Sequence, residues 1–222
     1  MMGNPGDDGI RELEVRIPDR GVEFAATMAV LPEPLGFVVF AHGSGSSRHS
    51  PRNRFVAETL QRAGLGTLLV DLLAVQEEAD RANVFDIELL ADRLVTSIRW
   101  LGERPEAEGR PIGFFGASTG AGAALWAAAD PMADVAAVVS RGGRPDLAGP
   151  KLAHVRAPTL LIVGGDDTMV IELNRIALAQ LTCPAELEIV PGATHLFEEP
   201  GTLEQVAVLA RDWFLRHLGS AA

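Results

Sequence analysis

The stretch Ile112-Gly113-Phe114-Phe115-Gly116-Ala117-Ser118-Thr119-Gly120 decides the fold of this chain. It joins a short apolar run to an alanine-rich run over residues 122–129. A Gly-x-Ser-x-Gly pattern between a predicted strand and a predicted helix is typical of a nucleophile elbow. In such an elbow the serine occupies a tight, strained turn, and the two glycines avoid collisions with the neighbouring strand and helix.

The same pentapeptide also has a plain structural interpretation. A glycine-rich turn can lead from a strand into a helix while Ser118 acts only as the helix N-cap. The downstream sequence favours the catalytic interpretation, because two loops with the required side chains follow in order. The pair Asp166-Asp167 comes after the apolar run 159–163, and His195 comes after the run 187–190.

These motifs together resemble the α/β-hydrolases, and specifically their small dienelactone-hydrolase-like branch. The segments that carry the resemblance are 42–47 (His-Gly-Ser-Gly-Ser-Ser), 116–120, 164–170 and 191–197. They extend from about residue 36 to the C-terminus, and their order, serine then aspartate then histidine, matches this superfamily. Dienelactone hydrolases proper carry cysteine in the elbow, whereas this chain has Ser118. Its single cysteine, Cys183, lies in a helix-to-strand connection, so the resemblance implies a serine hydrolase more broadly.

Alternating strand and helix patterns predict an α/β fold with a mostly parallel, doubly wound sheet. Residues 1–9 read as a disordered tail, and 10–222 as a single α/β-hydrolase domain. The remaining elements are expected as follows: antiparallel edge strands at 10–17 and 22–31 joined by a turn at 18–21; further strands at 36–41, 67–70, 111–115, 133–140, 158–163 and 186–190; helices at 55–63, 85–101, 170–181 and 202–218.

Right-handed crossovers place the loops after the parallel strands along one sheet edge, where Ser118, Asp167 and His195 can meet. Only 49 residues separate Ser118 from Asp167 (167 − 118), and predicted elements fill most of them, so no cap domain is expected. The longest loop at this edge, residues 72–84, is expected to give partial cover.

In the catalytic interpretation His195 is the base for Ser118, and Asp167 orients His195. Asp166 competes with Asp167 for this role, and the resemblance to the family spacing favours Asp167. The backbone N–H groups of Thr119 and Ser44 are the expected oxyanion donors. His42 reads as a residue that organises its loop rather than as a base, and Asp71 as a turn cap.

Three arginines are candidates for binding a substrate carboxylate or phosphate. Arg141 and Arg144 follow a predicted strand at the active edge, and Arg48 lies beside the expected oxyanion loop. The alternative interpretation is that each pairs with a neighbouring acid in this acidic protein.

The composition and net charge of the chain limit the classes of partner that it can bind. The 222 residues are 47% hydrophobic with a net charge of −11, which argues against nucleic acid or an anionic membrane as the main partner. The sequence predicts no metal or other cofactor, no signal peptide and no transmembrane span, and it favours a cytoplasmic location. The oligomeric state stays open.

The main hypothesis is therefore a hydrolase that cleaves a small carboxylic ester, lactone or thioester through an acyl-enzyme. Acyl transfer to an acceptor other than water uses the same intermediate and is the first alternative. A non-catalytic ligand-binding protein on the same fold is the second.

Overall fold

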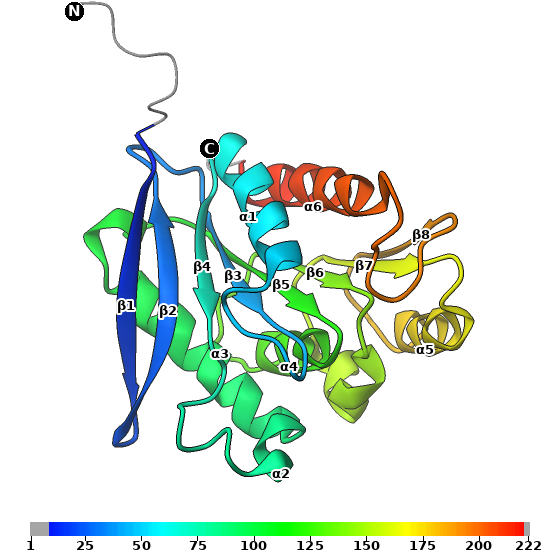
Figure 1. Ribbon diagram of the computed structural model, residues 1–222, viewed down its shortest axis with the longest axis horizontal. Helices are drawn as coiled ribbons and strands as arrows, with labels where there is room; N and C mark the ends of the chain where they lie inside the picture. The colour runs from blue at the N-terminus through cyan, green and yellow to red at the C-terminus, as the bar shows by residue number, and fades with distance from the viewer. Residues whose placement is uncertain (1–8, 220–222) are drawn as a thin grey trace, which may run out of the picture.

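The computed structural model describes residues 9–219 and contains one eight-stranded mixed sheet (Figure 1). The predicted tail, apart from residue 9, lies outside the described residues. The strand order across the sheet is β1-β2-β4-β3-β5-β6-β7-β8. The first two neighbour pairs in this order are antiparallel, and all the others are parallel. The mostly parallel α/β architecture predicted from the alternating patterns is confirmed.

The strands are β1 Arg11–Asp19, β2 Val22–Val30, β3 Phe37–Ala41, β4 Gly66–Val70, β5 Ile112–Ala117, β6 Ala137–Arg141, β7 Thr159–Gly164 and β8 Ala185–Val190. The helices are α1 Pro51–Arg62, α2 Arg81–Val84, α3 Ile87–Gly102, α4 Thr119–Ala128, α5 Thr168–Leu178 and α6 Thr202–Leu218. Two 3₁₀ segments complete the list, η1 Pro105–Ala107 and η2 Pro145–His154.

Helices cover both faces of the sheet (Figure 1). Helices α1 and α6 pack on one face, against apolar side chains such as Phe40 and Phe115. Helices α3, α4 and α5 pack on the other face together with η2. Strands β3, β4, β5, β6 and β7 are buried along their whole length, which explains why they read as continuous apolar runs rather than as alternating patterns.

Several predicted boundaries were wrong by a few residues. Helix α1 begins at Pro51 rather than 55, because the Ser50 side chain accepts a hydrogen bond from the Asn53 N–H and caps the helix. The β1–β2 turn is confined to two left-handed residues, Arg20 and Gly21, so β1 continues to Asp19 rather than ending at residue 17. Strand β6 begins at residue 137 rather than 133.

Three short elements were missed. The 72–84 loop ends in the one-turn helix α2, the 3₁₀ segment η1 lies between α3 and β5, and the 3₁₀ segment η2 lies between β6 and β7. No helix within residues 9–219 is long and apolar enough to cross a membrane. The carboxyl ends of β3 to β8 define one edge of the sheet, and the candidate site lies there.

Candidate active site

Ser118 occupies the turn between β5 and α4 in a conformation that L-residues rarely adopt, with φ 50° and ψ −121°. The flanking glycines explain how the turn fits. A Cβ at Gly116 would lie 2.4 Å from the Cα of Ala121, and a Cβ at Gly120 would lie 2.4 Å from the backbone oxygens of Ala41 and His42. Backbone atoms cannot move aside cheaply, so both positions require glycine for steric reasons.

The three predicted triad side chains lie in contact. Nδ1 of His195 is 2.7 Å from Oδ2 of Asp167, and Nε2 of His195 is 3.3 Å from Oγ of Ser118. Because a carboxylate only accepts hydrogen bonds, Nδ1 carries the proton and Nε2 is free to accept one from Ser118. The Asp167 side chain is 13% exposed and that of His195 is 39% exposed, so the ring is accessible while its partner is shielded.

Asp166, the competing acid, lies elsewhere. It is exposed, and its backbone N–H donates to the Ala193 oxygen. Asp167 is the N-cap residue of α5, but its side chain makes no capping bond and points to His195 instead. The structure therefore brings Asp167, and not its neighbour, to the histidine.

Two unexpected contacts hold the His195 loop. The Glu199 carboxylate accepts both the backbone N–H of Thr194 at 3.0 Å and its hydroxyl at 2.6 Å. These hydrogen bonds, the hydroxyl first, lower the pKa of Glu199. Phe197 has a left-handed backbone, with φ 56°, and its ring is buried beneath the loop. Neither the contacts of Glu199 nor the conformation of Phe197 was predicted from the sequence. The only signal available for the Glu199 contacts was the spacing between Thr194 and Glu199.

The predicted oxyanion donors lie side by side at the start of α4. The Ser44 N–H donates to the Thr119 hydroxyl oxygen at 2.8 Å, and Thr119 is the first residue of the helix. Its own backbone N–H belongs to the helix N-terminus, where the free N–H groups and the dipole favour negative charge. The side-chain bond between Thr119 and Ser44 was not predicted.

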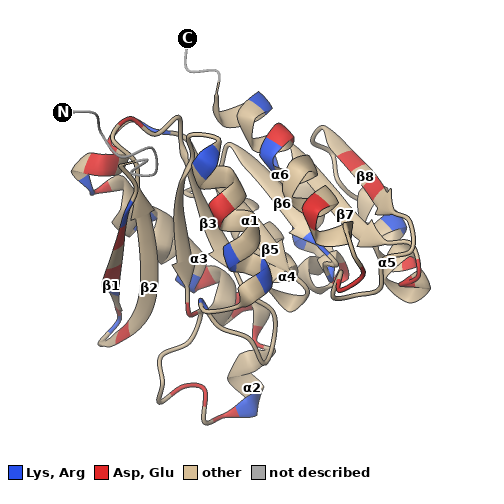
Figure 2. Cartoon of the chain, turned by 45° about the horizontal axis from the view of Figure 1, so that its top comes forward, with Lys and Arg blue, Asp and Glu red and all other residues tan. Residues whose placement is uncertain are grey.

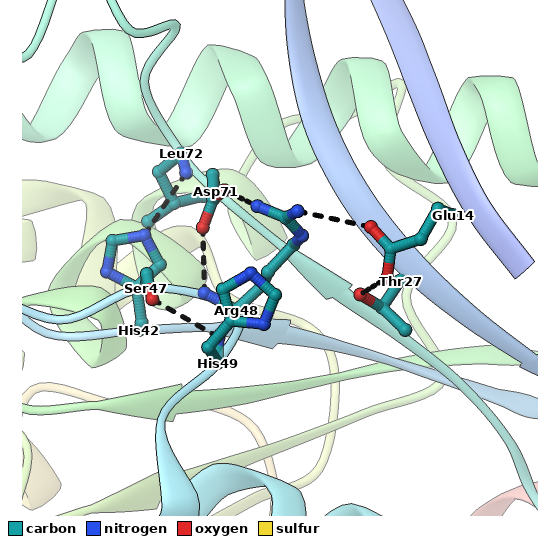
Figure 3. A network of polar contacts seen from close by, with 8 residues as sticks. All are labelled: Glu14, Thr27, His42, Ser47, Arg48, His49, Asp71 and Leu72. Carbon is teal, nitrogen blue, oxygen red and sulfur yellow. Dashed lines mark hydrogen bonds and ion pairs between the residues drawn. The ribbon is translucent and has the colours of Figure 1, made fainter. Parts of the chain in front are cut away.

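His42 organises the loop that carries Ser44 (Figure 3). Its Nδ1 lies 2.9 Å from the Gly43 oxygen, and its Nε2 lies 3.3 Å from the Leu72 nitrogen. A proton on Nδ1 satisfies both contacts, since Nε2 then accepts from the Leu72 N–H. The Nε2 contact joins the loop after β3 to the loop after β4, and the Nδ1 contact lies within the loop after β3, so His42 organises its loop as the sequence predicted.

Arg48 pairs with acids (Figure 3). Its guanidinium contacts Asp71 and, at 3.1 Å, Glu14, while its backbone N–H donates to Asp71 at 2.7 Å. Partial burial lowers the pKa of Arg48, but the side-chain contacts with Asp71 and Glu14 outweigh this effect, so the pKa is raised overall. Asp71, expected to cap a turn, instead anchors the loop that carries Ser44.

The other two candidate arginines differ from each other. Arg144 forms a two-pronged ion pair with Asp146 at 2.7 and 2.8 Å. Arg141 is only 6% exposed, and within residues 9–219 no carboxylate pairs with it. Binding of a substrate by these arginines stays a prediction, as it does for Arg48.

The surroundings of Arg141 are unusual for a charged group. Its Nη2 reaches Oδ1 of Asn53 at 3.5 Å, its guanidinium carbon lies 5.8 Å from the centre of the Phe197 ring, and its Nε is buried without a partner. Burial, with a smaller contribution from the nearby Arg52, lowers the pKa of Arg141 to about 10.

A cavity of about 560 Å³ adjoins the elbow. Gly43, Ser44 and Thr119 form part of its wall, and the 72–84 loop and α3 form another part. This volume is in the usual range for a small-molecule site. Over the residues described, no cluster of three His, Cys, Asp or Glu is arranged to hold a metal ion.

Comparisons with known proteins agree with this architecture. The chain is 54% identical to the dienelactone hydrolase from Anabaena variabilis, with a TM-score of 0.90, covering 94% of this chain and 98% of that one. The structure of Est1E from Butyrivibrio proteoclasticus with ferulic acid bound is similar in fold, at 17% identity and a TM-score of 0.79 over 93% of this chain and all of that one.

Two curated Mycobacterium tuberculosis proteins, named "Putative phosphoribosyl transferase", are 62% identical over 212 residues. The match covers 96% of this chain and 48% of theirs, so the chain spans about half the length of these relatives. The family model described as "Dienelactone hydrolase family" matches residues 24–216, which include every site residue discussed above except Glu14. The chain therefore belongs to the dienelactone hydrolase family.

Proposed function

We propose that this chain is a serine hydrolase that cleaves a small carboxylic ester, lactone or thioester through an acyl-enzyme. The observation that carries the proposal is the chain of contacts from Ser118 Oγ to His195 and from His195 to Asp167. A serine hydroxyl becomes a useful nucleophile only when a base of this kind removes its proton.

In the proposed reaction the Ser118 oxygen attacks the substrate carbonyl while its proton moves to Nε2 of His195. Asp167 stabilises the imidazolium that forms. When the tetrahedral intermediate collapses, His195 returns the proton to the leaving group, and an acyl-Ser118 ester remains. Water, activated by the same histidine, then attacks this ester and releases the acid.

The negative charge on the intermediate needs donors, and we assign this role to the backbone N–H groups of Thr119 and Ser44. The Ser44 N–H is bonded to the Thr119 hydroxyl in the structure, so it exchanges that partner for the oxyanion during the reaction. The short distance between the two residues supports their joint role.

A fluorophosphonate probe tests the nucleophile. We expect covalent labelling at Ser118 that is lost in Ser118→Ala. A folded wild-type protein that stays unlabelled would contradict the proposal.

The paired acids supply a matched test of the triad. Asp167→Asn is expected to lower kcat by about 10³–10⁴-fold, because the histidine loses its orienting carboxylate. Asp166→Asn removes the neighbouring charge but no contact with His195, so its kcat should stay within about twofold of wild type. Equal losses in the two variants would refute the assignment.

We infer that the transferase in the name of the mycobacterial relatives refers to the part of those proteins outside the match. In this chain the matched part carries the elbow and its contacting histidine and aspartate, which are suited to acyl chemistry. This chain should therefore show no phosphoribosyl transfer from phosphoribosyl pyrophosphate to purine or pyrimidine bases, and product analysis checks this expectation.

A further inference from the structure

The cavity beside the elbow has a chemically distinctive lining. Its apolar part comes from the loop after β4, from α2 and from α3, through Leu72, Leu73, Val84 and Leu90. The opposite part is the serine-rich loop after β3, which supplies hydroxyl and backbone groups together with the imidazoles of His42 and His49. A substrate group bound here therefore meets an apolar wall on one side and hydroxyl, backbone and imidazole groups on the other.

Lysine and arginine are absent from the lining formed by the described residues. Arg48 is adjacent in sequence to lining residues, but its guanidinium is bonded to Asp71 and Glu14 (Figure 3). Arg144 is likewise paired with Asp146. A carboxylate entering the cavity would thus lose hydration without gaining a lysine or arginine partner, which is costly.

The cavity also presents a negative charge. Acidic residues follow one another along the loop that leads to α2 (Figure 2), and one of them, Glu78, is part of the lining. The loop is held in place by Glu77, whose carboxylate pairs with the buried Arg93 at 2.5 Å and accepts the Ala74 N–H at 2.8 Å. The backbone of Glu78 is therefore held at the wall of the cavity, where its N–H donates to the Ala74 oxygen at 3.2 Å, and its exposed carboxylate repels the carboxylate of a substrate.

We propose that this cavity accepts uncharged, largely apolar ester groups, and that Glu78 is a specificity-determining residue that excludes substrates with a free carboxylate. This inference rests on the proposed function and adds the substrate class to it.

Matched pairs of esters test the proposal on both sides of the scissile bond. The acyl pair is methyl p-nitrophenyl adipate and p-nitrophenyl hydrogen adipate. The alcohol pair is 4-(methoxycarbonyl)phenyl butyrate and 4-carboxyphenyl butyrate. Each pair differs only by a methyl ester against a free carboxylate, and rates are measured at pH 8 after subtraction of spontaneous hydrolysis.

We expect kcat/KM to favour the neutral member of at least one pair by roughly tenfold or more, since the anionic group loses hydration and meets a like charge. Glu78→Gln should reduce this preference, and Glu78→Arg should reduce it further or reverse it. The pair whose preference changes in the Glu78 variants shows whether the cavity holds the acyl group or the alcohol group of the substrate.

Glu108→Gln is the control, because this exposed glutamate lies before the start of β5, at the other end of the strand from the site. Its preference should equal that of wild type. Equal kcat/KM values within both pairs, or a preference for the carboxylates, would overturn the proposal. So would a preference that is the same in wild type and in both Glu78 variants.

Binding to Ser118→Ala separates this proposal from the proposed function. Calorimetric titration of that variant with the same four esters should again show tighter binding of the neutral members, whether or not turnover occurs. If fluorophosphonate labelling and hydrolysis fail but neutral esters still bind preferentially, the catalytic proposal is wrong and the assignment of the cavity stands. Equal binding of neutral and anionic esters overturns the cavity assignment alone.

Discussion

Replacing Arg141 by methionine should stabilise the protein, although it removes a charged side chain from the edge of the active site. Arg141 is 6% exposed, and within the described part of the chain no carboxylate pairs with it. Methionine is similar in length, is unbranched and adapts to irregular space, so it can fill most of the volume of the arginine side chain.

The magnitude follows from the pKa. Burial lowers the pKa of Arg141 well below its ordinary value, to about 10, and each pKa unit corresponds to about 1.4 kcal/mol, so the charge costs on the order of 3 kcal/mol of folding free energy. For a base whose pKa is lowered by folding, this cost applies in full at every pH below about 10. The cation–π contact with Phe197 returns about 1 kcal/mol, and the 3.5 Å bond to Asn53 adds little.

The net expectation is a gain of about 1–2 kcal/mol, or a rise in Tm of about 2–8 °C for a domain of this size. Urea unfolding and calorimetry at pH 6 to 9 measure it, and the gain should be constant over this range. Arg144→Met is the matched control, since it breaks a partly exposed ion pair and should lose at most about 1 kcal/mol. A loss of stability in Arg141→Met equal to or larger than that of the control would refute the reasoning.

Three further substitutions test other parts of the structure. Gly120→Ala places a Cβ 2.4 Å from two backbone oxygens at the end of β3, so we expect a loss of about 2 kcal/mol in urea unfolding and a fall in esterase kcat of about 100-fold or more. Arg93→Met leaves two carboxylates without their buried partner and should cost about 3 kcal/mol, measured in the same way. The pKa of His217 is lowered by burial and by Arg216, so the unfolded chain binds its proton more readily and wild-type stability falls as the pH drops through histidine's titration range. His217→Gln should therefore flatten the decline in unfolding free energy between pH 7 and pH 5.

For each of these three substitutions, one experimental outcome would contradict the prediction. Full activity in Gly120→Ala would show that the elbow can shift to accommodate a methyl group. A stable Arg93→Met variant would mean that its two acids are well solvated once the arginine is gone. An unchanged pH slope in His217→Gln would assign the acid sensitivity of the protein to other groups.

The elbow and the order of the elements could be read from the sequence, because both depend on local rules. Buried parallel strands must be apolar on both faces, and the turn at Ser118 tolerates only glycine at 116 and 120. The strand-to-helix alternation then places every following loop at one edge, which is why Asp167 and His195 could be anticipated. The beginning of α1 was missed because Pro51 is also compatible with a loop, and only the Ser50 cap decides the matter.

Only the tertiary structure decided which groups pair with the charged side chains and the hydroxyls around the elbow. The sequence offered three arginines as equivalent candidates. Two of them have partners from distant segments, Asp71 and Glu14 for Arg48 and the Phe197 ring for Arg141, whereas Arg144 pairs with Asp146 two residues along the chain. The bond between Ser44 and Thr119 joins residues 75 positions apart. Local pattern specifies backbone conformation, but the energy of a charge depends on all the groups that folding brings around it.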